Sequence, residues 1–208
     1  MGNGKAPSGI DLDTPEPIDD GTTARIGSPP PGPVGLDSKG GNAKQSKASM
    51  AERIVSYATR NRGQRVGDGE CYTLVNRALT AADAKTARDF GAVSPNADYV
   101  WGASVTLTEL QPGDVIQFRD YTFKRVDVTD DDSGTTTDEQ EGDRPHHTAI
   151  VQSVDGNGAV TVWEQNAPAG SSVRRTQLFF TSRRTTSGNR TTTITVGGTF
   201  WFYRPEAR

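Results

Sequence analysis

The chain has 208 residues, of which 32% are hydrophobic, and a formal net charge of −3. This length suits one domain with a core, but the low hydrophobic fraction predicts that part of the chain is unfolded. The acidic balance argues against a nucleic-acid partner, and no apolar stretch approaches the ~20 residues that span a bilayer. Because the N-terminus lacks the apolar core of a signal peptide, we expect a cytoplasmic monomer or a protein exported by a non-classical route.

Residues 1 to 48 are predicted to form a disordered arm. Gly, Pro, Ser, Asp and Lys dominate this segment, Pro29-Pro30-Pro31 lies within it, and its few apolar residues show no periodicity. Such an arm is either a solvated tether or a segment that binds a protein partner. The folded domain is therefore expected to span residues 49 to 208.

The first residues after the arm predict a helix. Ser49 is a favourable N-cap residue, and Ile54, Val55 and Ala58 are spaced to share one helical face. The Asn-Arg-Gly sequence at residues 61–63 is typical of a helix end.

The chain's only cysteine, Cys71, is predicted to lie on the first turn of a second helix. Gly67 and Gly69 interrupt the chain just before it, and apolar residues then recur at helical spacing, at Tyr72, Val75, Ala78 and Leu79. A lone cysteine excludes an internal disulfide and a multi-cysteine zinc site. Cys71 is therefore a buried spectator, a thiol that links to a partner, or a nucleophile.

The rest of the chain predicts a meander of about six antiparallel strands, which together with the two helices indicates an α+β domain. Apolar and β-branched runs mark the strands, at residues 115–118, 121–128, 148–154, 159–164, 173–180, 191–196 and 199–203. The acidic segment at about residues 129–144 has no apolar residues. It is predicted to be a mobile insert rather than a core element.

The position of Cys71 favours nucleophilic chemistry. A helix N-terminus lowers the pKa of a thiol and offers unpaired N–H groups to a developing oxyanion. A neighbouring imidazolium lowers the pKa further, and the only two histidines, His146 and His147, precede the predicted strand at 148–154. One of them reaches the thiol if this strand packs against the Cys71 helix.

The predicted hairpin brings His147 toward two polar residues. A short turn at Asn157-Gly158 sets residue 147 roughly opposite residues 163–166. Glu164 and Asn166 are two residues apart on their strand and so share one face, from which either one can orient the imidazole. Because His146 and His147 point to opposite faces, they are not expected to hold a metal ion with Glu164. No metal and no cofactor are expected.

These motifs, in this order, resemble the papain-like amidase and peptidase group that includes the CHAP and NlpC-type domains. That group carries Gly-x-Cys at the start of a helix, then a Pro-Gly-Asp strand, a His-x-Ala-Ile-Val strand and Glu-x-Asn. The matching residues, within a resemblance over about residues 50 to 205, are Gly69-Glu70-Cys71, Pro112-Gly113-Asp114-Val115-Ile116, His147-Thr148-Ala149-Ile150-Val151 and Glu164-Gln165-Asn166. The chain is also similar to a cysteine-proteinase-fold domain at the C-terminus of some fungal cortical actin-patch proteins.

The resemblance to the CHAP and NlpC-type group implies a role for each matching residue. Cys71 would be the nucleophile and His147 the general base, with Glu164 or Asn166 orienting the imidazole. Gln64, upstream of the cysteine, fits the glutamine that donates to the oxyanion in papain-like enzymes, or it is an exposed residue at a helix end. His146 has no assigned role.

Three functions are compatible with these residues. The resemblance implies a cysteine hydrolase that cleaves an amide or peptide bond through a thioester, on a peptidoglycan-derived or other peptide substrate. The second is a binding or scaffold module that keeps the papain-like fold without turnover, and the third is an exported effector or toxin. Large aromatic residues are expected in the core or along a substrate groove: Trp101, Trp163, Trp201, Phe202 and Tyr203.

Overall fold

The computed structural model describes residues 10–11 and 48–208. The predicted disordered arm, residues 1 to 48, therefore lies almost wholly outside the described residues. Within it, strand β1 (Ile10–Asp11) pairs with strand β6 (Arg174–Phe179). Within these described ranges, the helices are all too short or too polar to cross a membrane.

The remaining elements of the described chain follow in the order of two helices, a short helical region and a run of strands. The helices are α1 (Met50–Arg60), α2 (Cys71–Ala81), α3 (Ala87–Phe90) and the 3-10 helix η1 (Leu107–Glu109). The other strands are β2 (Ala103–Val105), β3 (Val115–Asp131), β4 (Gly134–Gly156), β5 (Ala159–Glu164), β7 (Arg183–Ser187) and β8 (Arg190–Arg204).

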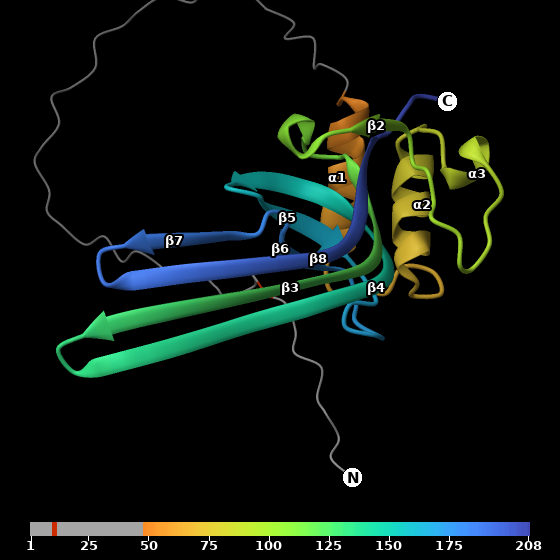
Figure 1. The fold of residues 1–208 in the computed structure, drawn as a ribbon. Coiled ribbons are helices and arrows are strands. Elements are labelled where there is room, and N and C mark those ends of the chain that lie inside the picture. Colours follow the sequence, from red (N-terminus) through yellow and green to blue (C-terminus); the bar gives the residue numbers. More distant parts are fainter. Residues whose placement is uncertain (1–9, 12–47) are drawn as a thin grey trace, which may run out of the picture. The chain divides into compact units, whose positions relative to one another are not determined.

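The strands form one antiparallel sheet, which confirms that part of the predicted fold class. The described part of the chain holds eight strands, in the order β1-β6-β5-β4-β3-β8-β2 with β7 paired to β8 (Figure 1). The prediction of about six strands missed the short ones, because a strand of two to five residues shows little alternation. Conversely, the two separate strands predicted at residues 115–118 and 121–128 are both part of one strand, β3. The two predicted at residues 191–196 and 199–203 are likewise both part of β8.

Helix α1 begins at a complete capping box. The Glu52 N–H donates to the Ser49 hydroxyl at 3.2 Å, and the Ser49 N–H donates to the Glu52 carboxylate at 2.7 Å. Two helix-end donors are thereby satisfied. The helix then buries Ile54 and Ala58 on the face that the sequence predicted.

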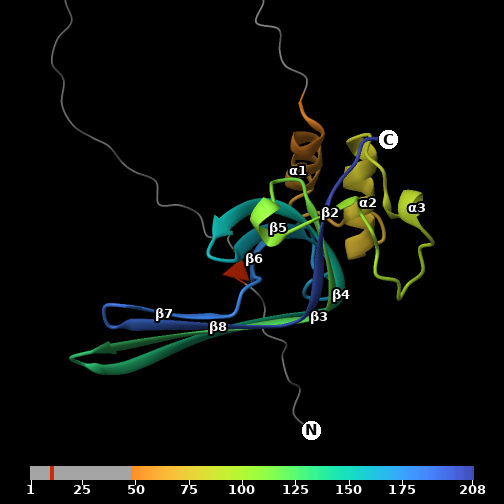
Figure 2. The ribbon, with the colours of Figure 1, turned by 45° about the horizontal axis from the view of Figure 1, so that its top comes forward.

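Helices α1 and α2 lie side by side and pack on one face of the sheet (Figures 1 and 2). Ile54 of α1 and Leu74 and Leu79 of α2 share a core with Ile150 and Trp163 of the sheet. Fully burying a side chain of this size stabilises the fold by about 1.5–3 kcal/mol. This core fixes the N-terminus of α2 against strands β4 and β5.

A second core covers the other face of the sheet, because successive residues of a strand point to opposite sides. On β4, Ile150 faces the helices, whereas Ala149 and Val151 belong to the second cluster. This cluster is rich in aromatic rings, and Tyr121 crosses it to donate to the Phe179 carbonyl at 2.6 Å. Of the large aromatics predicted for core or rim, Trp101, Trp163 and Phe202 are buried.

Strands β3, β4 and β8 bend, and with β7 their distal parts run away from the helices as an arm, here called the distal arm (Figure 2). The pairing of β3 with β8 shifts register between Arg119 and Thr122, which marks a bulge. Opposite the bulge, Gly198 has a φ of 81°, and a Cβ atom there would lie 2.1 Å from the Asp120 carbonyl oxygen. Only glycine fits this position, and such a bulge bends the strand.

The segment at about residues 129–144, which the sequence predicted as a mobile insert rather than a core element, extends strands β3 and β4. These residues lie in β3 and β4 and pair across the hairpin as far as Asp131 and Gly134. Most of their side chains are exposed, so no hydrophobic alternation marks the strands. Threonine, which recurs there, favours extended structure through its branched Cβ atom rather than through burial.

Candidate active site

Cys71 is the first residue of α2 and follows a loop that requires glycine. Gly67 and Gly69 have φ angles of 63° and 92°, in a region that glycine adopts at little cost. The Glu70 carbonyl accepts the N–H groups of Thr73 and Leu74, so the helix begins directly after the loop. The thiol therefore lies at a helix N-terminus, where unpaired N–H groups and the helix dipole stabilise an anion.

His147 of β4 is buried beside the thiol. Its Nε2 atom donates to the Glu164 carboxylate at 3.1 Å, and its ring lies close enough to the Cys71 thiol for each group to shift the pKa of the other. Since a carboxylate accepts only from a protonated nitrogen, Nε2 carries a proton and Nδ1 is the nitrogen left for the thiol. The ring also packs against Phe118, with ring centroids 5.9 Å apart.

Glu164 is itself held by Arg144, a residue that the sequence analysis did not identify. The Arg144 guanidinium donates from Nε to one carboxylate oxygen at 2.9 Å and from Nη2 to the other at 2.6 Å. Both side chains are buried. Burial raises the pKa of Glu164, but Arg144 and His147 together hold it well below its usual range, so the carboxylate is ionised.

The Cys71 and His147 side chains shift each other's pKa in opposite directions. Burial raises the pKa of the Cys71 thiol, but the charge and hydrogen bond of His147 and the N–H groups of Thr148 and Tyr72 outweigh it, and the pKa is lowered. Burial lowers the pKa of His147, but Cys71 and then Glu164 raise it to about 9. Both shifts favour a thiolate–imidazolium pair near neutral pH.

The structure separates the two residues that the sequence offered as orienting groups. Glu164 contacts His147 as described above, whereas the Asn166 side chain donates to the Glu70 carboxylate at 3.0 Å. Asn166 has a φ of 63° and accepts the Gly170 N–H at 2.6 Å, so it shapes the turn after β5. Strand β5 ends at Glu164, so strand alternation no longer places Asn166 on the same face as Glu164.

Gln64 lies outside the site. Its side chain is exposed, and its backbone pairs with Val173 through a 2.9 Å hydrogen bond in the loop after α1. It is absent from the residues that line the cleft around Cys71. The oxyanion donor that the described residues offer at the thiol is instead the backbone N–H of Cys71 at the start of α2, because it donates to no other described group.

Gln165 connects β5 to the loop before Cys71 and was not identified from the sequence. Its side chain accepts the Val66 N–H at 3.0 Å and donates to the Val66 and Glu70 carbonyls at 3.1 and 2.7 Å. All three contacts are made by a fully buried amide. Strand alternation gave no signal for it, because β5 ends at Glu164.

Cys71 and His147 open onto a cleft of about 370 Å³. Its lining comes from the loop before α2, from the segment before β2 and from the paired strands β3 and β4: Asp68, Glu70, Cys71, Tyr72, Thr73, Val93, Ser94, Pro95, Tyr99, Gln117, His146, His147 and Thr148. His146 faces away from His147 and donates to the Ala97 carbonyl at 2.8 Å. Among the described residues, no group of three His, Cys, Asp or Glu is placed to hold a metal ion.

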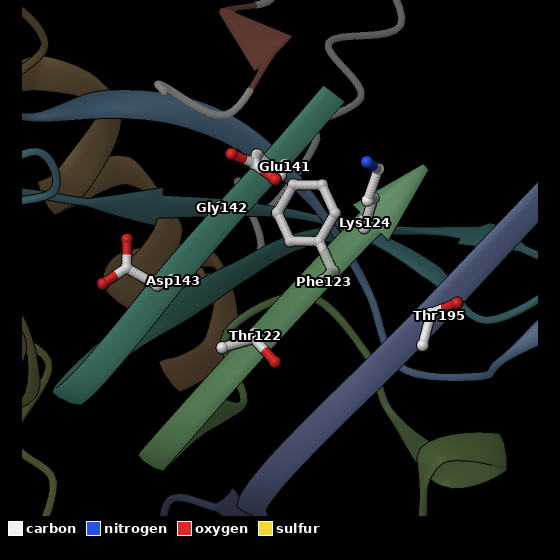
Figure 3. Close-up of a pocket in the computed structure, with 7 residues that line it drawn as sticks. All are labelled: Thr122, Phe123, Lys124, Glu141, Gly142, Asp143 and Thr195. Atoms are coloured by element: carbon white, nitrogen blue, oxygen red, sulfur yellow. The ribbon is translucent and has the colours of Figure 1, made fainter. Parts of the chain in front are cut away.

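A second hollow, of about 350 Å³, lies on strands β3, β4 and β8 where the distal arm begins. Figure 3 shows the Phe123 ring directed toward Glu141 and Gly142 of the neighbouring strand. A Cβ atom on Gly142 would lie 2.7 Å from this ring, so the ring fills the space that glycine leaves. The lining holds neither cysteine nor histidine, and we therefore place the candidate active site at Cys71.

Comparison with known proteins agrees with this fold. The model of the AIM3/BBC1 cysteine proteinase-fold domain matches residues 28–182, which include Cys71, Arg144, His147 and Glu164. No curated protein and no solved structure matches the chain. The match confirms the similarity to the domain of fungal actin-patch proteins, and the chain belongs to the AIM3/BBC1 cysteine proteinase-fold domain family.

Proposed function

We propose that the domain is a cysteine-dependent hydrolase that cleaves an amide or peptide bond. The observation that carries this proposal is the contact chain from Cys71 through His147 to Glu164, beside an open cleft. A thiol at a helix N-terminus, a histidine and an acceptor that orients it are the parts that nucleophilic catalysis by cysteine requires. The order of these residues along the chain also supports a relationship to the CHAP and NlpC-type enzymes.

Acylation begins from the thiolate–imidazolium pair. The Cys71 sulfur attacks the carbonyl carbon of the substrate, and the carbonyl π electrons move onto the oxygen. The backbone N–H of Cys71, at the start of α2, stabilises this oxyanion. When the oxyanion collapses, the carbon–nitrogen bond breaks, the leaving amine takes the proton from His147, and an acyl-thioester remains on Cys71.

Deacylation reverses the roles of the same groups. Neutral His147 takes a proton from water as the water oxygen attacks the thioester carbonyl. The second tetrahedral intermediate expels the Cys71 thiolate and releases a carboxylic acid, and His147 is left protonated. Glu164 holds the ring in one orientation through both steps, and Arg144 keeps Glu164 ionised.

The first test is the pH dependence of Cys71 alkylation by iodoacetamide, and the single cysteine makes the reading unambiguous. We expect the wild-type thiol to react with an apparent pKa below the ~8.5 of a free cysteine. His147→Ala should return the pKa toward that value. The matched control is His146→Ala, which should leave the profile unchanged because the His146 ring bonds the Ala97 carbonyl rather than the thiol.

Turnover is tested with the p-nitrophenyl ester of N-acetylglycine. We expect the wild type to release more than one equivalent of nitrophenolate and Cys71→Ala to release none above the background rate. A wild-type thiol that alkylates slowly, or at the same rate with and without His147, contradicts the hydrolase. The papain-like fold would then act as a binding module.

A further inference from the structure

The charged residues that line the Cys71 cleft, apart from the Cys71–His147 pair, are carboxylates. Asp68 and Glu70 form the rim on the side of α2, and no lysine or arginine lines the cleft. Both carboxylates are exposed and lie in the loop that leads directly into Cys71. Any group that approaches the sulfur therefore passes two negative charges.

The hydrogen bonds that hold both carboxylates come from neutral donors, and the charge of Arg77 acts on Asp68 in addition. Asp68 accepts the Glu70 N–H at 3.0 Å, and this bond together with that of the Thr73 side chain lowers the pKa of Asp68. Glu70 accepts from the Asn166 amide at 3.0 Å. Arg65 lies near this loop, but it donates to the Asp68 backbone carbonyl and not to the carboxylate. Among the described residues, the printed partner of the Glu70 carboxylate is thus the neutral Asn166 amide, and Glu70 is the carboxylate whose charge is more available to a ligand.

The remaining lining of the cleft includes aromatic and apolar residues. Tyr72 and Tyr99 stand with ring centroids 5.0 Å apart, and Val93 and Pro95 lie beside them in the cleft lining. Aromatic faces attract an organic cation and also pack against its hydrocarbon stem. Carboxylates and tyrosine rings in one cleft suit a side chain such as that of lysine or arginine.

Acidic residues ahead of a helix have an ordinary explanation, since they stabilise its positive end. Glu70 does not fit that explanation well, because it is the N-cap residue of α2 and its side chain makes no capping hydrogen bond. Instead Asn166, whose own amide oxygen is fixed by the Gly170 N–H, holds Glu70 at the mouth of the cleft.

We propose that Asp68 and Glu70 select substrates that carry a positive charge next to the scissile bond, so that the cleft acts on cationic peptides. This inference rests on the proposed hydrolase, since it concerns the substrate of that same site. Glu70 is a specificity residue in this account: it attracts the cation and takes no part in bond breaking.

The test compares two thiol reagents of opposite charge on Cys71. Trimethylammonioethyl methanethiosulfonate is cationic and sulfonatoethyl methanethiosulfonate is anionic. With either one, the thiolate attacks the sulfenyl sulfur, a disulfide forms, and methanesulfinate leaves with the electron pair. The measured quantity is the rate of the cationic reagent divided by that of the anionic reagent, and this ratio is divided by the same ratio for free 2-mercaptoethanol. It reports the effect of the charge in the cleft alone, because any change in the thiol pKa affects both reagents equally.

We expect this ratio to favour the cationic reagent in the wild type and to fall by about 3- to 15-fold in Glu70→Gln, as for one unit charge near the reaction path in high dielectric. The preference should also weaken as salt is added. Glutamine keeps an oxygen for Asn166, so the loop is retained. Glu141→Gln, on an exposed residue of β4 outside the cleft, is the matched control and should not change the ratio.

Three nitrophenyl esters then identify the source of the charge: Nα-acetyl-lysine, norleucine with a free α-amino group, and Nα-acetyl-norleucine. The proposal is supported if either cationic ester acylates Cys71 faster than the neutral Nα-acetyl-norleucine ester and this advantage is lost in Glu70→Gln. Which of the two cationic esters is faster shows whether the cleft binds a side-chain cation or a terminal amine. An identical reagent ratio in wild type, Glu70→Gln and Asp68→Asn overturns it. That outcome differs from failure of the hydrolase, which would appear as an unactivated thiol whatever the reagent charge.

Discussion

The contact chain at the candidate active site depends on a buried charge that the reacting groups never touch. Arg144 satisfies both oxygens of Glu164, and one of these oxygens also accepts from His147. A buried carboxylate without a cation becomes protonated or distorts the site, since moving a lone charge out of water costs several kcal/mol. Arg144 therefore sets the protonation state of the group that orients the imidazole.

Removing one member of this ion pair should destabilise the fold more than removing both. We expect Arg144→Met or Glu164→Leu alone to lower the free energy of unfolding by about 3–5 kcal/mol, because each leaves an uncompensated buried charge. The double variant should regain much of this loss, since apolar groups replace the pair. Urea unfolding measures all three variants.

Thiol reactivity separates the structural role of the pair from its role in orienting His147. The double variant should be stable but should show a Cys71 pKa closer to that of a free thiol, because His147 has lost its acceptor. A stable double variant with the wild-type alkylation profile would show that Glu164 does not support the thiolate.

At the level of elements, the site is made where helix α2 begins and strand β5 ends, beside the middle of strand β4. Helix α2 begins at Cys71, strand β5 ends at Glu164, and β4 passes between them with His147. The Gln165 side chain joins the first two, because it bonds both the N–H and the carbonyl of Val66 and the carbonyl of Glu70. These contacts fix the loop from which the nucleophile projects.

Replacing Gln165 should loosen this loop. We expect Gln165→Leu to lower the free energy of unfolding by about 1–3 kcal/mol, since buried backbone groups lose their partners. The Cys71 alkylation pKa should rise as the thiol moves from His147. Thermal melting and the iodoacetamide profile measure the two effects.

Gln64→Ala is the control for this variant, because Gln64 lies in the same region of the chain but its side chain is exposed. It should change neither the melting temperature nor the thiol. An equal effect of the two substitutions would contradict the role given to Gln165.

The sequence predicted the parts of this arrangement that follow local rules. The helix that starts at Cys71, the strand that carries His147 and the contact of Glu164 with His147 follow from glycine breaks, apolar periodicity and strand pairing. The sequence left open whether Glu164 or Asn166 orients His147, and whether Gln64 is an oxyanion donor or an exposed residue. Asn166 and Gln64 lie where regular structure stops, so that alternation and helical spacing no longer fix their direction. Arg144 precedes the predicted start of its strand and lies in a stretch whose exposed residues show no hydrophobic alternation. No local rule could therefore identify it.

At the level of the whole molecule, the sheet has two parts with different surroundings. One part is covered by the helices and holds the site, whereas the distal arm extends away from them (Figure 2). The bulge at Asp120, opposite Gly198, lies between these parts. Chemistry at Cys71 should therefore be independent of the tip of the arm.

Shortening the β3–β4 hairpin tests this independence. Replacing residues 127–138 with Asn-Gly joins Val126 to Glu139, which already pair, through a two-residue hairpin turn. We expect a modest loss of stability, because Asp127 no longer holds Arg190 and Thr192. The alkylation profile of Cys71 should be unchanged, because none of the removed residues lines the cleft.

Gly198→Ala provides the contrast, since it changes one atom at the bend instead of removing the tip. The new Cβ would meet the Asp120 carbonyl, and a residue forced to positive φ adds strain of its own. We expect it to lower the melting temperature more than the deletion does, while Gly91→Ala, with open space around its Cβ position, should have little effect. If the deletion altered the thiol while Gly198→Ala did not, the acidic tip would act on the cleft directly, and the two parts of the sheet would have to be treated as one functional unit.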